Sequence, residues 1–132
     1  MANRRNILKL KDPELFDCFV ARYHADLQSL RLQLQRLREA PSLNQPRELE
    51  LIFTSVVYFA GPLNWTSADF CIAPPEDLLA VLYRSRILNT NHPQDEIDET
   101  LATYRLFVVP TLDDFSIQII AHYQDFALNP ID

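Results

Sequence analysis

The sequence predicts an all-α fold, a bundle of about five helices with a long N-terminal helix. The chain of 132 residues has one glycine, Gly61, against nine prolines, whereas tight hairpins favour residues that accept a positive φ, above all glycine. Leucine is the commonest apolar residue, and it loses little rotamer freedom in a helix. Prolines followed by acidic side chains recur along the chain, a pattern typical of helix starts.

We expect a single helical domain over residues 12–132, preceded by a basic N-terminal arm over residues 1–11. Residues 1–47 carry a net charge of +4 and residues 48–132 a net charge of −10, which gives the chain its −6. Such an uneven distribution concerns association with partners rather than the fold.

The longest predicted helix covers residues 13–40, after the capping residue Asp12 and before Pro41. Its apolar residues recur at alternating spacings of four and three: Phe16, Val20, Tyr23, Leu27, Leu30, Leu34 and Leu37. This stripe is either the core face of a long helix or the seam of a coiled coil shared with a second chain. A homodimer through the stripe is therefore one predicted assembly.

The remaining chain predicts four shorter helices. Residues 46–60 fit a helix face and an alternating strand equally well, and we choose a helix because a proline starts the segment and Gly61 ends it. Further helices are predicted over 75–88, from Pro93 onward, and over 111–127. The alternative is an α+β fold with a small sheet from 50–59 and 105–109, where β-branched and aromatic residues gather.

Most catalytic signatures are missing from the sequence. A single glycine cannot build a phosphate-binding loop, and the chain has no CxxC pair, no HExxH motif and no glycine-flanked serine. His122 and Asp125 have no third metal ligand near them in sequence, and His24 is expected at the surface. The acidic run 95–99 is expected to be a solvated helix face, or else a surface that attracts a basic partner. We therefore expect no enzyme, no metal and no cofactor.

Arg86 and His92 form an Arg-x5-His spacing across a helix-to-helix turn. This spacing is similar to the signature of the HEPN family of small all-helical proteins, many of which are metal-independent ribonucleases. The resemblance implies that Arg86 would bind a phosphate and His92 would transfer protons, with a dimer completing the site. A simpler interpretation makes Arg86 a cation at a helix C-terminus and His92 a residue near the next helix start.

The predicted function is a non-enzymatic protein–protein interaction module, such as a regulatory adaptor or an assembly factor. Trp65 and Phe70 are the predicted anchors, because aromatic residues dominate interface hot spots, and Arg4 and Arg5 would steer the partner by charge. The partner is another protein of unknown identity rather than nucleic acid, since most of the chain is acidic enough to repel phosphates. The HEPN-like ribonuclease is the alternative.

We expect a cytoplasmic protein without a membrane span. No signal peptide opens the chain, and no apolar run is long enough to cross a bilayer. Cys18 and Cys71 do not form a disulfide framework in a chain of this size and are expected to be small buried hydrophobic residues.

Overall fold

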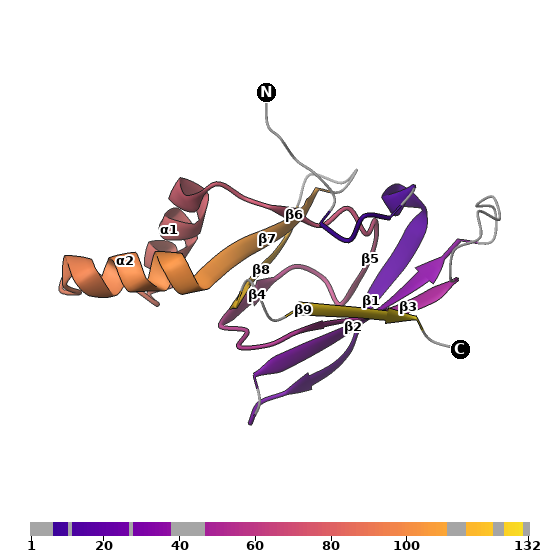
Figure 1. The fold of residues 1–132 in the computed structure, drawn as a ribbon, viewed down its shortest axis with the longest axis horizontal. Coiled ribbons are helices and arrows are strands. Elements are labelled where there is room, and N and C mark those ends of the chain that lie inside the picture. Colours follow the sequence, from indigo (N-terminus) through magenta and orange to yellow (C-terminus); the bar gives the residue numbers. More distant parts are fainter. Residues whose placement is uncertain are drawn as a thin grey trace.

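The computed structural model describes residues 7–10, 12–26, 28–37, 47–110, 116–122 and 126–130. Within these residues the chain forms two antiparallel sheets and two α-helices (Figure 1). The first sheet has the strand order β5-β1-β2-β3-β9 and the second sheet the order β4-β8-β7-β6. The elements, in chain order, are η1 (Pro13–Leu15), β1 (Phe16–His24), β2 (Ser29–Arg36), β3 (Glu48–Phe53), β4 (Tyr58–Ala60), β5 (Asn64–Thr66), β6 (Cys71–Ile72), α1 (Pro75–Arg84), α2 (Gln94–Thr103), β7 (Tyr104–Pro110), β8 (Ser116–His122) and β9 (Phe126–Pro130).

The predicted all-α bundle is wrong, because 47% of the described residues are in strands and only 22% are helical. The helix predicted over 13–40 is instead an antiparallel hairpin, in which Phe16 of β1 lies opposite Arg36 of β2. The coiled-coil stripe is therefore divided between two strands, and it forms no helical seam. Leu27 lies outside the described residues.

Strict alternation explains why β2 is a strand. Leu30, Leu32 and Leu34 are buried, whereas Arg31 and Gln33 between them are only partly buried. β3 repeats the pattern, with alternate residues pointing into the core. A period of two puts every second side chain on the same face of a sheet, so these strands have one apolar face and one polar face.

The helices predicted over 46–60 and 111–127 are also wrong. The first segment forms β3 and β4, and the described parts of the second belong to β8 and β9. Strands are present in the segments of the α+β alternative, 50–59 and 105–109, but they belong to two large sheets rather than to one small one.

The two helices begin where the prolines predict them, since Pro75 is the first residue of α1 and Pro93 is the N-cap of α2. The predicted helix over 75–88 is shorter in the structure and ends at Arg84. Among the described residues, no helix is both long enough and apolar enough to cross a membrane.

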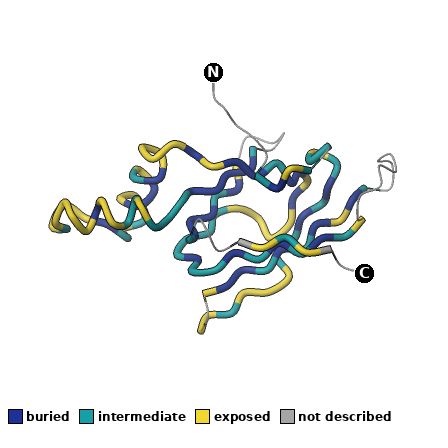
Figure 2. The backbone as a smooth tube through the Cα atoms, in the orientation of Figure 1, coloured by how far each residue is buried: buried dark blue, intermediate teal, exposed yellow. Residues whose placement is uncertain are grey.

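The second sheet separates two apolar clusters. Phe107 and Val109 of β7 face the first sheet, and the neighbouring Leu106 and Val108 face the helices. All four of these side chains are buried, so β7 is covered on both faces. The molecule thus has three layers: the first sheet, the second sheet and the helices (Figures 1 and 2).

Part of the predicted N-terminal arm packs on this structure. The backbone N–H of Ile7 donates to the carbonyl of Phe70 at 2.8 Å, and Leu8 is buried. Residues 1–6 and 11 lie outside the described part of the chain.

Residues other than glycine make the tight turns. The backbone φ is positive at Lys9, Asp12, Gln28, Ser55, Ser67 and Arg86. Such a conformation places Cβ close to the backbone and costs roughly 1–2 kcal/mol for a residue that is not glycine. The scarcity of glycine therefore does not prevent hairpins in this protein, although it makes their turns less favourable.

Arg86 occupies the position after α1 where glycine is most common. Its N–H donates to the carbonyl of Tyr83 at 3.1 Å, and the N–H of Ile87 donates to that of Leu82 at 3.0 Å. These two bonds define a Schellman motif with Arg86 in the left-handed position, at φ 65°.

Replacing Arg86 with glycine is expected to stabilise the protein by about 1 kcal/mol, because the left-handed strain is relieved while both capping bonds remain. Urea denaturation followed by circular dichroism measures the change in the free energy of unfolding. Arg86→Ala is the matched control, since it removes the same side chain but keeps Cβ, and it should give no such gain. An equal gain for both variants would contradict the explanation.

Candidate functional site

An apolar groove of about 450 Å³ opens between the β1–β2 hairpin and the segment that leads into and out of β4. We call it the hairpin groove. It is lined by Val20, Tyr23, Gln28, Leu30, Val56, Val57, Tyr58, Phe59 and Leu63. None of these residues is a carboxylate, a histidine, a cysteine or a basic residue, so the groove offers apolar contact and a few hydroxyl and amide groups.

The hairpin groove exists because the inner face of the first sheet extends past the second sheet. Tyr23 pairs with Leu30, which is 3% exposed and faces the core, yet Tyr23 itself is 50% exposed. Figure 1 shows the end of the hairpin projecting away from the second sheet. Apolar side chains that would be covered elsewhere in the sandwich are left open here.

A β-bulge sets the side on which Tyr23 lies. Val20 pairs with Leu32 and Arg22 pairs with Arg31, so β1 has one more residue than β2 between these pairs. Without this extra residue in the ladder, every following side chain of β1 would point to the opposite face. The bulge thus directs Tyr23 into the groove.

Leu63 forms the most open part of the lining. Its side chain is 68% exposed, the highest value among the exposed large hydrophobic residues of the described chain, which are Tyr23, Leu63, Ile72 and Tyr83. Two of these four lie in the hairpin groove. Contiguous exposed apolar surface is costly to leave in water and marks surfaces that bind a partner.

An open strand edge runs beside the groove. β5 pairs with β1 only from Asp17 to Phe19, and the N–H of Val20 donates to the carbonyl of Leu63 at 2.8 Å. Beyond that bond, residues 21–24 of β1 have β2 on one side and no strand of the described chain on the other.

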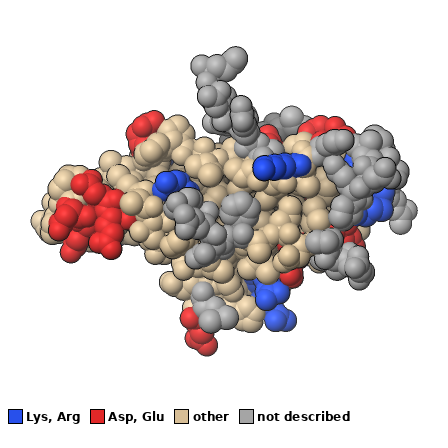
Figure 3. Space-filling model, in the orientation of Figure 1, with Lys and Arg blue, Asp and Glu red and all other residues tan. Residues whose placement is uncertain are grey.

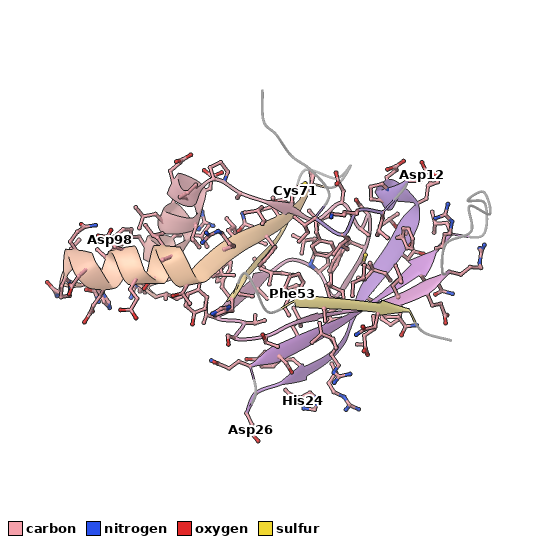
Figure 4. The ribbon with its side chains drawn as sticks, in the orientation of Figure 1. Asp12, His24, Asp26, Phe53, Cys71 and Asp98 are labelled. Atoms are coloured by element: carbon pink, nitrogen blue, oxygen red, sulfur yellow. The ribbon has the colours of Figure 1, made fainter. Side chains whose placement is uncertain are left out.

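Positive charge lies on the outer face of the same hairpin. Arg22 is directly opposite Arg31, and like charges in this position repel each other. Arg31 forms an ion pair with Glu50 at 3.2 Å, whereas no described carboxylate forms one with Arg22. Figure 3 shows basic side chains toward this part of the molecule, far from the acidic cluster over α2. Figure 4 places His24 and Asp26 at the tip of the hairpin.

A second, more polar pocket of about 510 Å³ lies beside α2. Its lining includes His92 and Glu99, and it includes Val57, which also lines the hairpin groove. The acidic run 95–99 therefore contributes to this pocket as well as to an exposed helix face. The described residues contain no cluster of three or more histidine, cysteine or acidic side chains that could hold a metal ion.

The structure does not bring Arg86 and His92 together at this pocket. Nδ1 of His92 accepts a hydrogen bond from the N–H of Asn89 at 3.0 Å, and the N–H of His92 donates to the carbonyl of Asn89 at 3.1 Å. His92 thus closes the turn between the helices, and Arg86 is exposed and is not part of the lining. The all-helical fold that the HEPN resemblance implies is contradicted.

The predicted anchors lie in the core rather than on the surface. Trp65 is 6% exposed and Phe70 is fully buried, and their ring centroids are 6.4 Å apart. Nε1 of Trp65 donates to the carbonyl of Ser67 at 2.8 Å, which satisfies its polar atom. Arg4 and Arg5 lie outside the described residues, so the predicted contact surface of these four residues remains a prediction without support from the geometry.

The other candidate residues have structural surroundings or lie beyond the described chain. The rings of His122 and Tyr104 are 6.4 Å apart in an edge contact, and Asp125 lies outside the described residues. Cys18 is fully buried, and its thiol donates to the carbonyl of Ser67 at 3.3 Å. Burial raises the pKa of the Cys18 thiol far above its ordinary value, and the charge of Asp17 raises the pKa further.

Replacing Phe70 with alanine is expected to destabilise the protein by about 3–5 kcal/mol, because the change opens a cavity in the core between the sheets. Thermal and urea denaturation measure the loss. Tyr83→Ala is the matched control, since Tyr83 is 37% exposed on α1 and should cost about 1 kcal/mol or less. Equal stability of Phe70→Ala and the wild type would contradict the burial of this ring.

Cys18 is expected to resist alkylation in the folded protein at pH 8 to 9, because its raised pKa keeps the thiol protonated and because only the thiolate reacts. Mass spectrometry after iodoacetamide treatment, with and without urea, measures this. Leu63→Cys provides an exposed thiol in the same chain as a positive control. Labelling of native Cys18 at the rate of that exposed thiol would contradict the structure.

Comparison with known proteins assigns the chain to no family. No protein-family model matches it, no curated protein matches it, and no solved structure matches it. The grounds for a function are therefore the hairpin groove, the open edge of β1 and the charges around them.

Proposed function

We propose that the protein is a non-enzymatic partner-binding module, a regulatory adaptor or assembly factor, and that it holds an apolar segment of another protein in the hairpin groove. The observation that carries the proposal is the exposure of Leu63 and Tyr23, at 68% and 50%, over a groove whose floor includes the buried residues Leu30 and Val56. Covering one such side chain fully stabilises a complex by about 1.5–3 kcal/mol before the costs of association.

The composition of the groove favours binding over catalysis. General acid–base chemistry most often uses a histidine or a carboxylate placed against the substrate. The lining has no histidine, cysteine or carboxylate, and its titratable groups are the phenols of Tyr23 and Tyr58. The volume of about 450 Å³ lies within the range of roughly 300–1,000 Å³ that ligand sites occupy. Such a groove can accept a few apolar side chains of a partner.

A cytoplasmic location is part of the same proposal. Cys18 and Cys71 are both free and buried, and free thiols in a small domain suit a reducing compartment.

A random linear peptide library displayed on phage tests the proposed site. Peptides rich in apolar residues should be selected by the wild-type protein, and the Leu63→Asp variant should bind them about tenfold or more weakly, because it places a carboxylate in the apolar contact. Fluorescence anisotropy with the synthetic peptides measures the dissociation constants.

Ile72→Asp is the matched control for that experiment. Ile72 is 42% exposed on β6 and does not line the groove, so its variant should bind like the wild type. A library that yields no binding peptide, or peptides that bind Leu63→Asp as tightly as the wild type, would refute the proposed site.

A further inference from the structure

We infer that the partner segment binds as an additional strand along residues 21–24 of β1, with apolar side chains in the hairpin groove and acidic side chains beside Arg22. This inference rests on the proposed function and specifies the chemistry of the segment. The occupant is an extended peptide in which apolar and acidic residues alternate.

The direction of the backbone hydrogen bonds along the hairpin supplies the first support. The N–H of Arg36 donates to the carbonyl of Arg47 at 2.7 Å. The backbone N–H and carbonyl groups of the even-numbered residues of β2 are therefore directed toward β3. The side to which backbone groups are directed alternates from residue to residue along an antiparallel strand, so the N–H and carbonyl of Leu30 are also directed toward β3. Its partner Tyr23 must then direct its own N–H and carbonyl to the open side of β1.

The position of the groove supplies the second support. A strand added at this edge places alternate side chains on the inner face of the first sheet. At residues 21–24 that face is the wall of the hairpin groove, formed by Tyr23 and Leu30 and closed by the exposed Leu63. One side of an added strand would therefore meet apolar surface along its length.

The charge of the outer face selects the other side chains. Arg22 and Arg31 lie opposite each other, and Glu50 pairs with Arg31 alone. A carboxylate on the outer face of an added strand would lie next to Arg22 across the strand pair and would relieve the repulsion between the arginines.

The same charge disfavours a second copy of this chain as the occupant. Pairing the 21–24 edge of two copies would bring Arg22 of each molecule to a surface that already carries two arginines. Charged side chains and bulges at exposed edges are a common means by which proteins avoid pairing with themselves. The charge at this edge thus favours pairing with an acidic strand and disfavours pairing with a second copy of the chain.

The test uses the tightest peptide from the phage library, made synthetically and bound to the chain of 132 residues. N-methylation removes one backbone N–H at a time, and it should weaken binding about tenfold or more at the peptide position that pairs with Tyr23 and little at the positions next to it. In the complex, hydrogen exchange of the Tyr23 amide should slow measurably, because this amide gains a partner.

A charge exchange tests the acidic side chains. Arg22→Glu should weaken binding of the selected peptide about tenfold, and replacing the acidic residues of the peptide with lysine should restore it. Arg84→Glu is the matched control, since Arg84 is an exposed arginine on α1 outside the groove, and it should change nothing.

Two results would overturn the inference and leave the proposed function standing. One is a peptide that still depends on Leu63 but tolerates N-methylation at every position and leaves Tyr23 exchange unchanged. The other is a dimer of the free chain that light scattering detects and that the Ala21→Pro substitution abolishes. Such a dimer would show that a second copy of the chain occupies the strand edge. Binding that does not depend on Leu63 would instead refute the proposed function itself.

Discussion

The aromatic contacts between the two sheets fix the positions of all other parts of the molecule. The ring of Phe53 in β3 lies 4.9 Å from that of Phe107 in β7 and 5.9 Å from that of Phe70, measured between centroids. These rings are fully buried, and tilted aromatic pairs of this kind add about 0.5–1.5 kcal/mol beyond the burial of their area. The sheets are held face to face where these residues meet.

The hairpin groove follows from where that contact lies. The ring of Phe53 lies at the end of β3, where Phe53 pairs with Leu30, and the far end of the β1–β2 hairpin beyond it stays exposed (Figure 2). Tyr23 and Leu30 face inward there without a second layer above Tyr23. The opening is thus a consequence of two sheets of unequal extent, and the bulge at Val20 and Arg22 keeps its wall apolar.

Some of the fold could be predicted from particular residues, and the rest depended on contacts distant in sequence. Pro75 and Pro93 locate the two helices, because the rules for helix starts are local. The alternation from Leu30 to Arg36 is also local and indicates a strand, but the spacing of four and three continues across the turn and predicts a helix over the same residues. The glycine argument is wrong because residues other than glycine adopt a positive φ here, among them Gln28 in the turn of the β1–β2 hairpin.

The candidate site could not be read from the sequence in the same way. Trp65 and Phe70 resemble binding residues in composition alone, but both are buried. The ring of Phe53 covers Phe70, and the rings of Phe59 and Phe70 pack against Trp65. Leu63 gives no sequence signal, because its exposure depends on which strands pass beside it. The like-charged pair of Arg22 and Arg31 becomes visible only once the register of the hairpin is known.

The burial of β7 on both faces has a consequence for how the protein unfolds. Leu106 and Val108 contact the helical layer, while Phe107 and Val109 contact the first sheet. Removing either layer would expose one complete apolar face of this strand to water, at a free-energy cost of about 25 cal/mol for each Å² of apolar surface. The helices and the sandwich are therefore energetically coupled through a single strand, and we expect the described layers to be lost in one cooperative transition rather than in stages.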